Sequence, residues 1–329
     1  MSVLALEQVE VEYERHHDVP LRAVCGVDLE IQAGNIVGLV GETGCGKSSL
    51  GRAAVGIVPP SHGRVLFEGR EVLPLDHGTR PAWLRRLQMV FQDPGGSLNP
   101  RRTVGAQLAD AVLHGTPEVQ PTDRAKPREL LERVGIDPEA TRRYPHEFSG
   151  GQRQRLAIAR ALACSPRCIV ADEPISSLDV SAQAEIGGLL VSLVRELEMA
   201  MLFISHDLAV VREISDFTAV MYLGKIVETG PTEEIWSRAR HPYTQALIKA
   251  IPHADQIGVL PAELPGDVPS PVNPPTGCRF HPRCPLAFDR CTRETPGMVR
   301  TGGVDVACFA VERGDSVRPP ANAVSEVLE

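Results

Sequence analysis

The sequence has few aromatic residues, no long apolar run and no excess of positive charge. Only 4% of its 329 residues are aromatic, and no apolar stretch approaches the ~18 residues of a membrane-spanning helix. Acidic residues outnumber basic ones by 42 to 34, which gives a formal net charge of −8. That balance argues against a nucleic-acid partner bound through its phosphates. The first 14 residues alternate apolar with polar positions and predict a strand rather than a signal peptide. We therefore expect a cytoplasmic protein.

Eight cysteines are present, and in a reducing compartment they are not expected to form structural disulfides. Four are scattered over the first 168 residues and four lie between positions 278 and 308. Residue patterning divides the chain into a large N-terminal domain over 1–250, with a helical subdomain at about 93–163, and a proline-rich linker over 251–276. A four-cysteine module over 277–311 and a frayed tail over 312–329 complete the predicted organisation.

The most informative segment is a glycine-rich loop between a predicted strand at 36–40 and a predicted helix from Ser48. It matches the phosphate-binding P-loop, in which backbone N–H groups and a helix N-terminus face phosphate oxygens. Lys47 can reach the β- and γ-phosphates, and Ser48 can ligate Mg²⁺. The candidate nucleotide-binding residues here are Gly41, Glu42, Thr43, Gly44, Cys45, Gly46, Lys47, Ser48 and Ser49.

Two acidic residues end the apolar run Cys168–Ala171. At the carboxyl end of a central strand, Asp172 can hold the Mg²⁺ shell. Glu173 can polarise the attacking water as a general base. The apolar runs at 168–171 and 201–204, separated by a helical pattern, predict a βαβ unit of a parallel sheet.

A third motif directly precedes the predicted helix 153–163. Its residues are Ser149, Gly150, Gly151 and Gln152, after Phe148. Ser149 is a good N-cap, and the two glycine amides add a second anion site at a helix N-terminus. The motif resembles the signature sequence of ATP-binding-cassette (ABC) ATPases, with Phe148 at a position where leucine is usual.

That resemblance assigns further residues in the expected order along the chain. Gln92 corresponds to the Q-loop glutamine that contacts the γ-phosphate or the Mg²⁺ shell, and Ser177–Asp179 to the D-loop of such ATPases. His206 corresponds to the switch histidine and Tyr13 to the aromatic residue that stacks on adenine. The implied fold is an α/β P-loop NTPase with a mixed or parallel core sheet, an antiparallel β region and a helical subdomain. ATP and Mg²⁺ are the implied ligands.

Three stretches outside the cassette motifs are similar to the ATPase subunits of oligopeptide and dipeptide importers. They lie at 90–100, 241–247 and 269–285. The resemblance implies an ATPase on the cytoplasmic face of the membrane that drives import of peptides, nickel or a related solute. It also implies the partners: a second, different ABC ATPase subunit, two transmembrane permease subunits and an extracytoplasmic solute-binding protein. The alternative, a soluble ABC ATPase in a non-transport complex, predicts large insertions or a basic surface, which the sequence lacks.

The late cysteines are the candidate metal ligands of the predicted C-terminal module. They are Cys278, Cys284, Cys291 and Cys308. A unit this small lacks a sufficient apolar core, so a metal would supply stability. Four thiolates suit Zn²⁺ or an iron–sulfur cluster. The tight C-x₂₋₄-C pairs of zinc sites are absent, which favours a [4Fe–4S] cluster over Zn²⁺ or free thiols.

Overall fold

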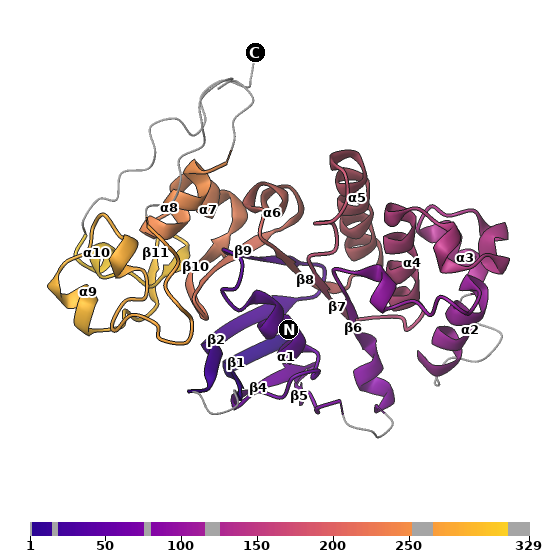
Figure 1. Cartoon of the computed structure of the whole chain (residues 1–329), viewed down its shortest axis with the longest axis horizontal. Helices are drawn as coiled ribbons and strands as arrows, with labels where there is room; N and C mark the ends of the chain where they lie inside the picture. The colour runs from indigo at the N-terminus through magenta and orange to yellow at the C-terminus, as the bar shows by residue number, and fades with distance from the viewer. Residues whose placement is uncertain (1, 15–18, 76–79, 116–125, 252–265, 315–329) are drawn as a thin grey trace, which may run out of the picture.

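The computed structural model describes residues 2–14, 19–75, 80–115, 126–251 and 266–314. Its centre is a sheet with the strand order β11-β12-β10-β9-β3-β8-β7-β6 (Figure 1). The strands of this sheet are β3 (Ile36–Val40), β6 (Leu87–Val90), β7 (Cys168–Asp172), β8 (Ala200–Ser205), β9 (Phe217–Tyr222), β10 (Lys225–Pro231), β11 (Val299–Thr301) and β12 (Val304–Val306).

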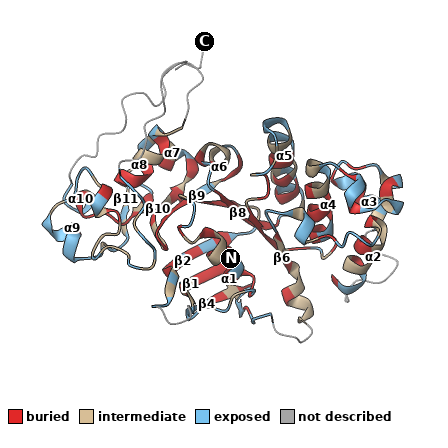
Figure 2. Ribbon diagram, in the orientation of Figure 1, coloured by how far each residue is buried: buried red, intermediate tan, exposed pale blue. Residues whose placement is uncertain are grey.

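The five strands from β9 to β6 pair in parallel, and β10, β11 and β12 continue the sheet antiparallel. Every residue of β3, β7 and β8 is buried. Continuous apolar strands of this kind are typical of a parallel sheet covered on both faces. Figure 2 shows this buried centre between more exposed outer elements.

A second, antiparallel sheet lies beside the first, with the order β2-β1-β4-β5. Its strands are β1 (Ser2–Tyr13), β2 (Leu21–Gln32), β4 (His62–Phe67) and β5 (Arg70–Glu71). Helix α1 (Lys47–Ala54) packs against both sheets, contacting β1, β2, β7 and β8. Leu50 and Ala54 of α1 are fully buried in the core that the two sheets share. The phosphate loop that precedes α1 is therefore anchored at the centre of the molecule.

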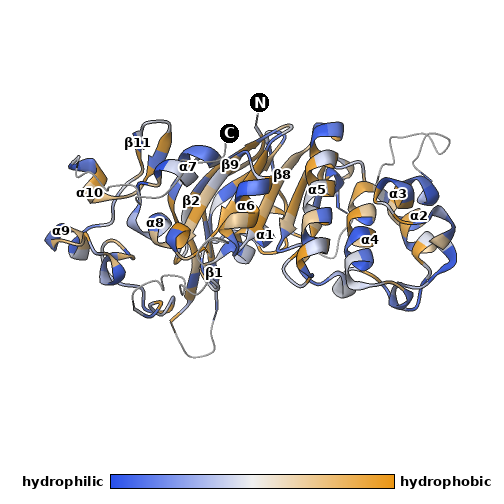
Figure 3. Ribbon diagram, turned by 90° about the horizontal axis from the view of Figure 1, so that it is seen from above, coloured by the Kyte–Doolittle hydropathy of each residue, from blue (hydrophilic) through white to orange (hydrophobic). Residues whose placement is uncertain are grey.

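A helical region lies at the β6 edge of the main sheet (Figure 1), and Figure 3 shows α2, α3 and α4 together at one end of the molecule, beyond α5. Its elements are η2 (Pro94–Gly96), α2 (Val104–Gly115), α3 (Pro127–Arg133), η3 (Pro138–Arg142), η4 (Pro145–Glu147) and α4 (Gly150–Leu162). The apolar sides of α2, α3 and α4 pack together, burying Leu108, Leu131 and Leu156. Amphipathic helices of this length gain most of their stability from such packing.

The remaining helices pack around the main sheet or belong to the C-terminal region of the chain. They are η1 (Ala82–Arg86), α5 (Val180–Leu197), α6 (Leu208–Ile214), α7 (Thr232–Arg238), α8 (Pro242–Lys249), η5 (His281–Arg283), α9 (Asp289–Arg293) and α10 (Phe309–Glu312). None of the helices in the described ranges is long and apolar enough to cross a membrane.

The C-terminal region joins the main sheet instead of standing apart from it. Strand β12 pairs with β10, so Val306 lies opposite Glu228. Phe280 is 1% exposed and packs on Tyr222 and Tyr243 of the cassette, with ring centroids 5.3 and 5.4 Å apart. Most of the predicted linker, 252–265, and most of the predicted tail, 315–329, lie outside the described residues. The core of the cassette therefore supplies much of the packing for this region.

Candidate functional site

The phosphate loop adopts a conformation that only glycine accommodates at two of its positions. Gly46 has φ of 109°, and a Cβ there would lie 2.1 Å from the carbonyl oxygen of Ala23. A Cβ on Gly41 would lie 2.1 Å from the carbonyl oxygen of Met221. The loop thus needs both the left-handed backbone and the missing side chain that glycine provides. Its curl leads into α1, whose first N–H groups have no side-chain cap.

Lys47 is enclosed by the loop. Its side chain is buried, with Nζ donating to the carbonyl oxygens of Gly41 at 2.7 Å and Glu42 at 3.1 Å. These contacts hold the ammonium group inside the curl of the loop, where the α1 N-terminus also favours anions. A buried cation beside uncapped helix N–H groups can bind a phosphate.

Two oxygen-bearing side chains from distant parts of the chain, Ser48 and Asp172, are in contact at the end of the loop. Ser48 Oγ donates to Asp172 Oδ1 at 2.9 Å. Burial raises the pKa of Asp172, and the charge of Glu173 raises it further. A hydroxyl and a buried carboxylate are hard oxygen ligands of the kind that Mg²⁺ prefers. The donor set therefore fits Mg²⁺, which would supply charge neutralisation for the phosphates.

Glu173 is held in a strained backbone conformation. Its φ of 47° is unusual for a residue with a side chain, and its N–H donates to Ile204 at 2.9 Å. Its carboxylate receives Gln92 Nε2 at 3.2 Å and lies 3.3 Å from Nδ1 of His206. Gln92 also donates to Ser176 Oγ at 3.3 Å. The structure thus brings three predicted residues, from the ends of β6, β7 and β8, into one cluster.

Tyr13 lies next to the helix that follows the phosphate loop. Its hydroxyl donates to Ser49 Oγ at 3.2 Å. Tyr13 is the last residue of β1, and its side chain is partly exposed beside the shared core. The stretch Arg15–Asp18, which separates Tyr13 from β2, lies outside the described residues.

The signature residues gather at another place. Ser149 caps α4, accepting from the N–H of Gln152 at 3.3 Å, and Gln152 Oε1 accepts from the N–H of Ser149 at 3.1 Å. Asp179 caps α5, accepting from Ala182 at 3.0 Å. Residues of both caps line one cavity of about 310 Å³, together with Gly150 and Gly151.

The signature and the phosphate loop of this chain are supported by different elements. Helix α1 packs on the two sheets, whereas α4 packs on α2, α3, α5 and β6. Among the described residues that line the signature cavity, none belongs to the loop 41–48. The signature residues and the phosphate loop therefore lie at two separate places on the chain.

Sequence reasoning missed the partner of Glu42. Arg283 forms a two-pronged ion pair with it, Nη1 to Oε2 at 2.8 Å and Nη2 to Oε1 at 3.1 Å. The N–H of Glu42 donates to the Tyr243 hydroxyl at 2.9 Å. Both partners fall in stretches that resemble the importer subunits, 241–247 and 269–285, but the pattern alone gives them no role.

The four late cysteines are near one another, and the described residues contain no group of three or more His, Cys, Asp or Glu side chains arranged to hold a metal. All four thiols are free. Burial raises the pKa of Cys278 to about 11 and that of Cys284 to about 12, with smaller effects from the other thiols of the group. The predicted iron–sulfur cluster and its Zn²⁺ alternative thus gain no support from the geometry, although four thiols are chemically suitable donors.

The fold and the loop define an ABC-type P-loop ATPase. The family described as ABC transporter matches residues 24–176, and the one described as oligopeptide/dipeptide transporter, C-terminal region, matches residues 227–291. A dimeric ATP-binding cassette solved with ADP and Pi, MJ0796, is 25% identical, with a TM-score of 0.59 over 70% of this chain and 98% of that one. The predicted α/β cassette fold is confirmed.

Relatives narrow the family further. A protein of Sinorhizobium fredii named "Probable peptide ABC transporter ATP-binding protein" is 50% identical over 93% of this chain and 86% of its own. The dipeptide transport ATP-binding protein DppF of Escherichia coli is 43% identical over 90% and 89%. The chain belongs to the family of ATP-binding proteins of oligopeptide/dipeptide ABC transporters, and its enzymatic activity is that of an ATPase.

Replacing Glu173 by glutamine tests its predicted role as general base. The amide keeps the size of the side chain but cannot accept a proton, so hydrolysis should fall at least about a hundredfold. ATP affinity should change little, because binding rests on the phosphate loop. Steady-state phosphate release and nucleotide titration measure the two quantities, with Glu213→Gln on the exposed side of α6 as the matched control. Turnover at the normal rate would exclude Glu173 as the base.

Proposed function

We propose that this chain powers the import of peptides across the cell membrane from its cytoplasmic face. The observation that carries the proposal is the combination, in one chain, of an ABC ATPase site and a C-terminal region of the oligopeptide/dipeptide transporter type. Relatives named for peptide, dipeptide and di/tripeptide transport support the solute class. The non-transport alternative has no comparable support.

In the proposed cycle, the loop 41–48 and Ser49 bind the phosphates of ATP, with Tyr13 beside the adenine. Ser48, Asp172 and Gln92 would hold Mg²⁺, which would neutralise charge on the phosphates. Glu173 takes a proton from the attacking water, and His206 orients the γ-phosphate. The contacts of Glu173 with Gln92 and His206 support this assignment, because they place the proposed base next to the two side chains that are proposed to contact the γ-phosphate or the Mg²⁺ shell.

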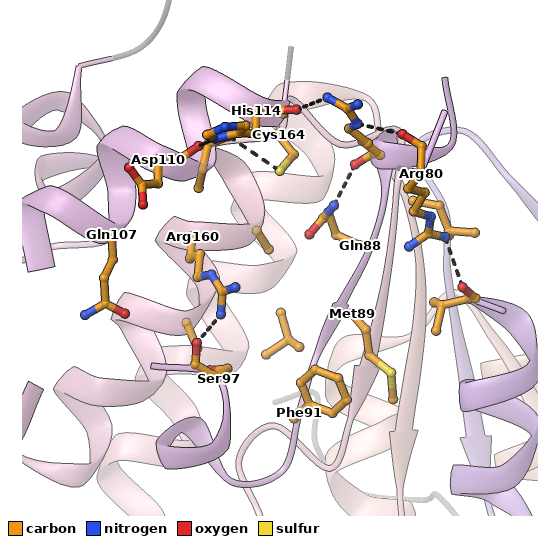
Figure 4. Close-up of a pocket in the computed structure, with 18 of the residues that line it drawn as sticks. Arg80, Gln88, Met89, Phe91, Ser97, Gln107, Asp110, His114, Arg160 and Cys164 are labelled. Atoms are coloured by element: carbon orange, nitrogen blue, oxygen red, sulfur yellow. Dashed lines mark hydrogen bonds between the residues drawn. The ribbon is translucent and has the colours of Figure 1, made fainter. Parts of the chain in front are cut away.

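A groove beside Gln92 is the proposed docking site for a helix of a permease subunit. It has a volume of about 630 Å³ and lies between the main sheet and the helical region (Figure 4). Among the described residues that line it, Arg80, Arg85, Arg102 and Arg160 are basic and Asp110 is the one carboxylate, paired with Arg102. Phe91, next to Gln92, also lines the groove, so a shift of Gln92 can reach an occupant. The partly basic lining suits the carbonyl end or an acidic side chain of a short helix.

Peptide uptake into vesicles containing the full reconstituted complex tests the proposed function. Wild-type complex should accumulate a labelled dipeptide or oligopeptide only with external solute-binding protein and ATP. Gln92→Ala should reduce uptake more than ATP affinity, because coupling depends on this contact and binding on the loop. The exposed Gln32→Ala is the control. Normal uptake with normal affinity in Gln92→Ala would remove this residue from coupling, and no uptake by wild type of any peptide would refute the solute class.

A second cassette is proposed to complete each ATP site. The signature residues Ser149, Gly150, Gly151 and Gln152, with Asp179, form a polar half-site apart from the phosphate loop, which is what a site shared between two subunits requires. The dimeric form of the MJ0796 cassette supports this arrangement. We propose that the partner here is a different ATPase subunit. ATP would then favour the closed pair by binding it more tightly than the open one.

Ser149→Arg distinguishes a shared site from a site within one chain. The arginine should lower hydrolysis at the nucleotide bound by the partner subunit, because it blocks the anion site at the start of α4. In the isolated chain, nucleotide affinity should be unchanged. Single-turnover hydrolysis in the complex and nucleotide titration of the isolated chain give the two measurements, with the exposed Ser61→Arg as control. An equal loss of affinity in both preparations would place Ser149 in its own chain's site.

The cysteines 278, 284, 291 and 308 are retained as a proposed [4Fe–4S] site, with Zn²⁺ as the alternative. Their shared region and number support it. Anaerobically purified chain should contain about four iron atoms and absorb near 400 nm, as expected of an Fe–S cluster. Cys278→Ser should lose both signals, while Cys164→Ser, outside the region, should keep them. Stoichiometric zinc would select the alternative, and the absence of both metals would leave free thiols.

A further inference from the structure

We infer that Arg283 is a positioning residue for nucleotide binding, through which the C-terminal region controls the charge and shape of the phosphate loop. The inference rests on the proposal that this loop binds ATP. It assigns to the C-terminal region a direct role at the ATP site. The features that carry it are the ion pair with Glu42, the way Arg283 is fixed in place, and a second contact from the same segment.

The ion pair lies in a place where its charge balance matters. The side chain of Arg283 is 3% exposed and that of Glu42 is 20% exposed. Glu42 is the second residue of the loop that holds Lys47, and its backbone carbonyl accepts from Lys47. An unpaired carboxylate there would repel phosphate, because little solvent screens it. Arg283 neutralises this carboxylate in a two-pronged geometry that also fixes its orientation.

Arg283 is itself held rigidly. Its N–H donates to the carbonyl of Phe280 at 3.0 Å within η5, and Phe280 is buried among Tyr222, Tyr243 and His241. The start of the segment is tied down by the N–H of Cys278, which donates to Cys291 at 2.8 Å. The position of the guanidinium group is therefore set by the packing of the C-terminal region, as a positioning role requires.

The same segment reaches the loop a second time. Arg279 donates to the carbonyl of Leu223, and the next residue, Gly224, donates its N–H to the carbonyl of Cys45 at 2.7 Å. The segment 278–284 thus touches the phosphate loop directly through Glu42 and indirectly through the β9–β10 turn. The position of the phosphate loop and that of the C-terminal region are therefore coupled through two sets of contacts from one segment.

The charge argument predicts that the two single variants change the Kd for AMP-PNP in opposite directions. A loss of structure would instead weaken binding in both. Arg283→Met leaves Glu42 unpaired and should raise the Kd for AMP-PNP on the order of tenfold. Glu42→Gln removes the negative charge beside the loop, while Arg283 keeps its positive charge and its contact with the Tyr222 hydroxyl, so the Kd should fall at least about threefold. The double variant should recover most of the Arg283→Met loss. Arg283→Lys, which keeps the charge but not the two-pronged geometry, should give a Kd between those of the wild type and Arg283→Met.

The measurement is calorimetric titration of the full-length chain with AMP-PNP and Mg²⁺, with thermal unfolding as the check on folding. Arg300→Met is the matched control, since it breaks an exposed ion pair with Asp305 in the same region. Reciprocity adds a second readout: nucleotide should increase hydrogen-exchange protection of 278–291 in the wild type, and by less in the double variant.

Several outcomes would overturn the inference. A Kd for Arg283→Met equal to wild type, weaker binding in both single variants, or no recovery in the double variant would each do so. If Arg283→Met does not fold, the Glu42→Gln variant provides the test. An affinity of Glu42→Gln for AMP-PNP that is equal to or weaker than that of the wild type would contradict the charge role. Lys47→Ala separates this inference from the proposed function. If Lys47→Ala binds AMP-PNP as tightly as the wild type, the loop is not the nucleotide site. If Lys47→Ala loses binding while Arg283→Met keeps it, the loop is the nucleotide site and Arg283 has no positioning role.

Discussion

Parallel pairing of β6, β7, β8 and β3 is the constraint on which the site depends. Parallel strands end at the same edge of a sheet, so residues that follow them meet although they are far apart in sequence. Gln92, Glu173 and His206 come together in this way, and the loop after β3 reaches the same edge. The polar residues can stand there because the strands behind them are buried and apolar.

The candidate residues at this edge could be picked out from the sequence because their signals are local. A glycine-rich loop after an apolar strand and acids at the end of another strand are readable without knowledge of the fold. Ser149 was similarly readable as an N-cap, since its partner Gln152 lies three residues away. Where the same few neighbouring residues determine both the secondary structure and the chemistry, the local sequence pattern is enough to predict the candidate site residues.

Contacts between distant segments could not be predicted in the same way. The pairing of Arg283 with Glu42 spans 241 residues, and neither side chain carries a local signal for the other. The strands β11 and β12 have three residues each, too short for an alternating pattern, yet they extend the main sheet. The cysteine spacing indicated a self-contained metal module, whereas the packing of Phe280 ties the region to the cassette.

The separation of the phosphate loop from the signature residues follows from where helices α1 and α4 pack. Helix α1 is locked between two sheets by fully buried side chains, so the phosphate loop cannot move without disturbing the core. Helix α4 packs mainly on the helical region, which meets the sheet through β6 and the residues after Gln92. The helical region is therefore joined to the main sheet through fewer elements than the phosphate loop is. In the proposed cycle, the anchored phosphate loop would bind the nucleotide, and the helical region would carry the response to the groove beside Gln92. The C-terminal region contacts the same loop through the pairing of Arg283 with Glu42.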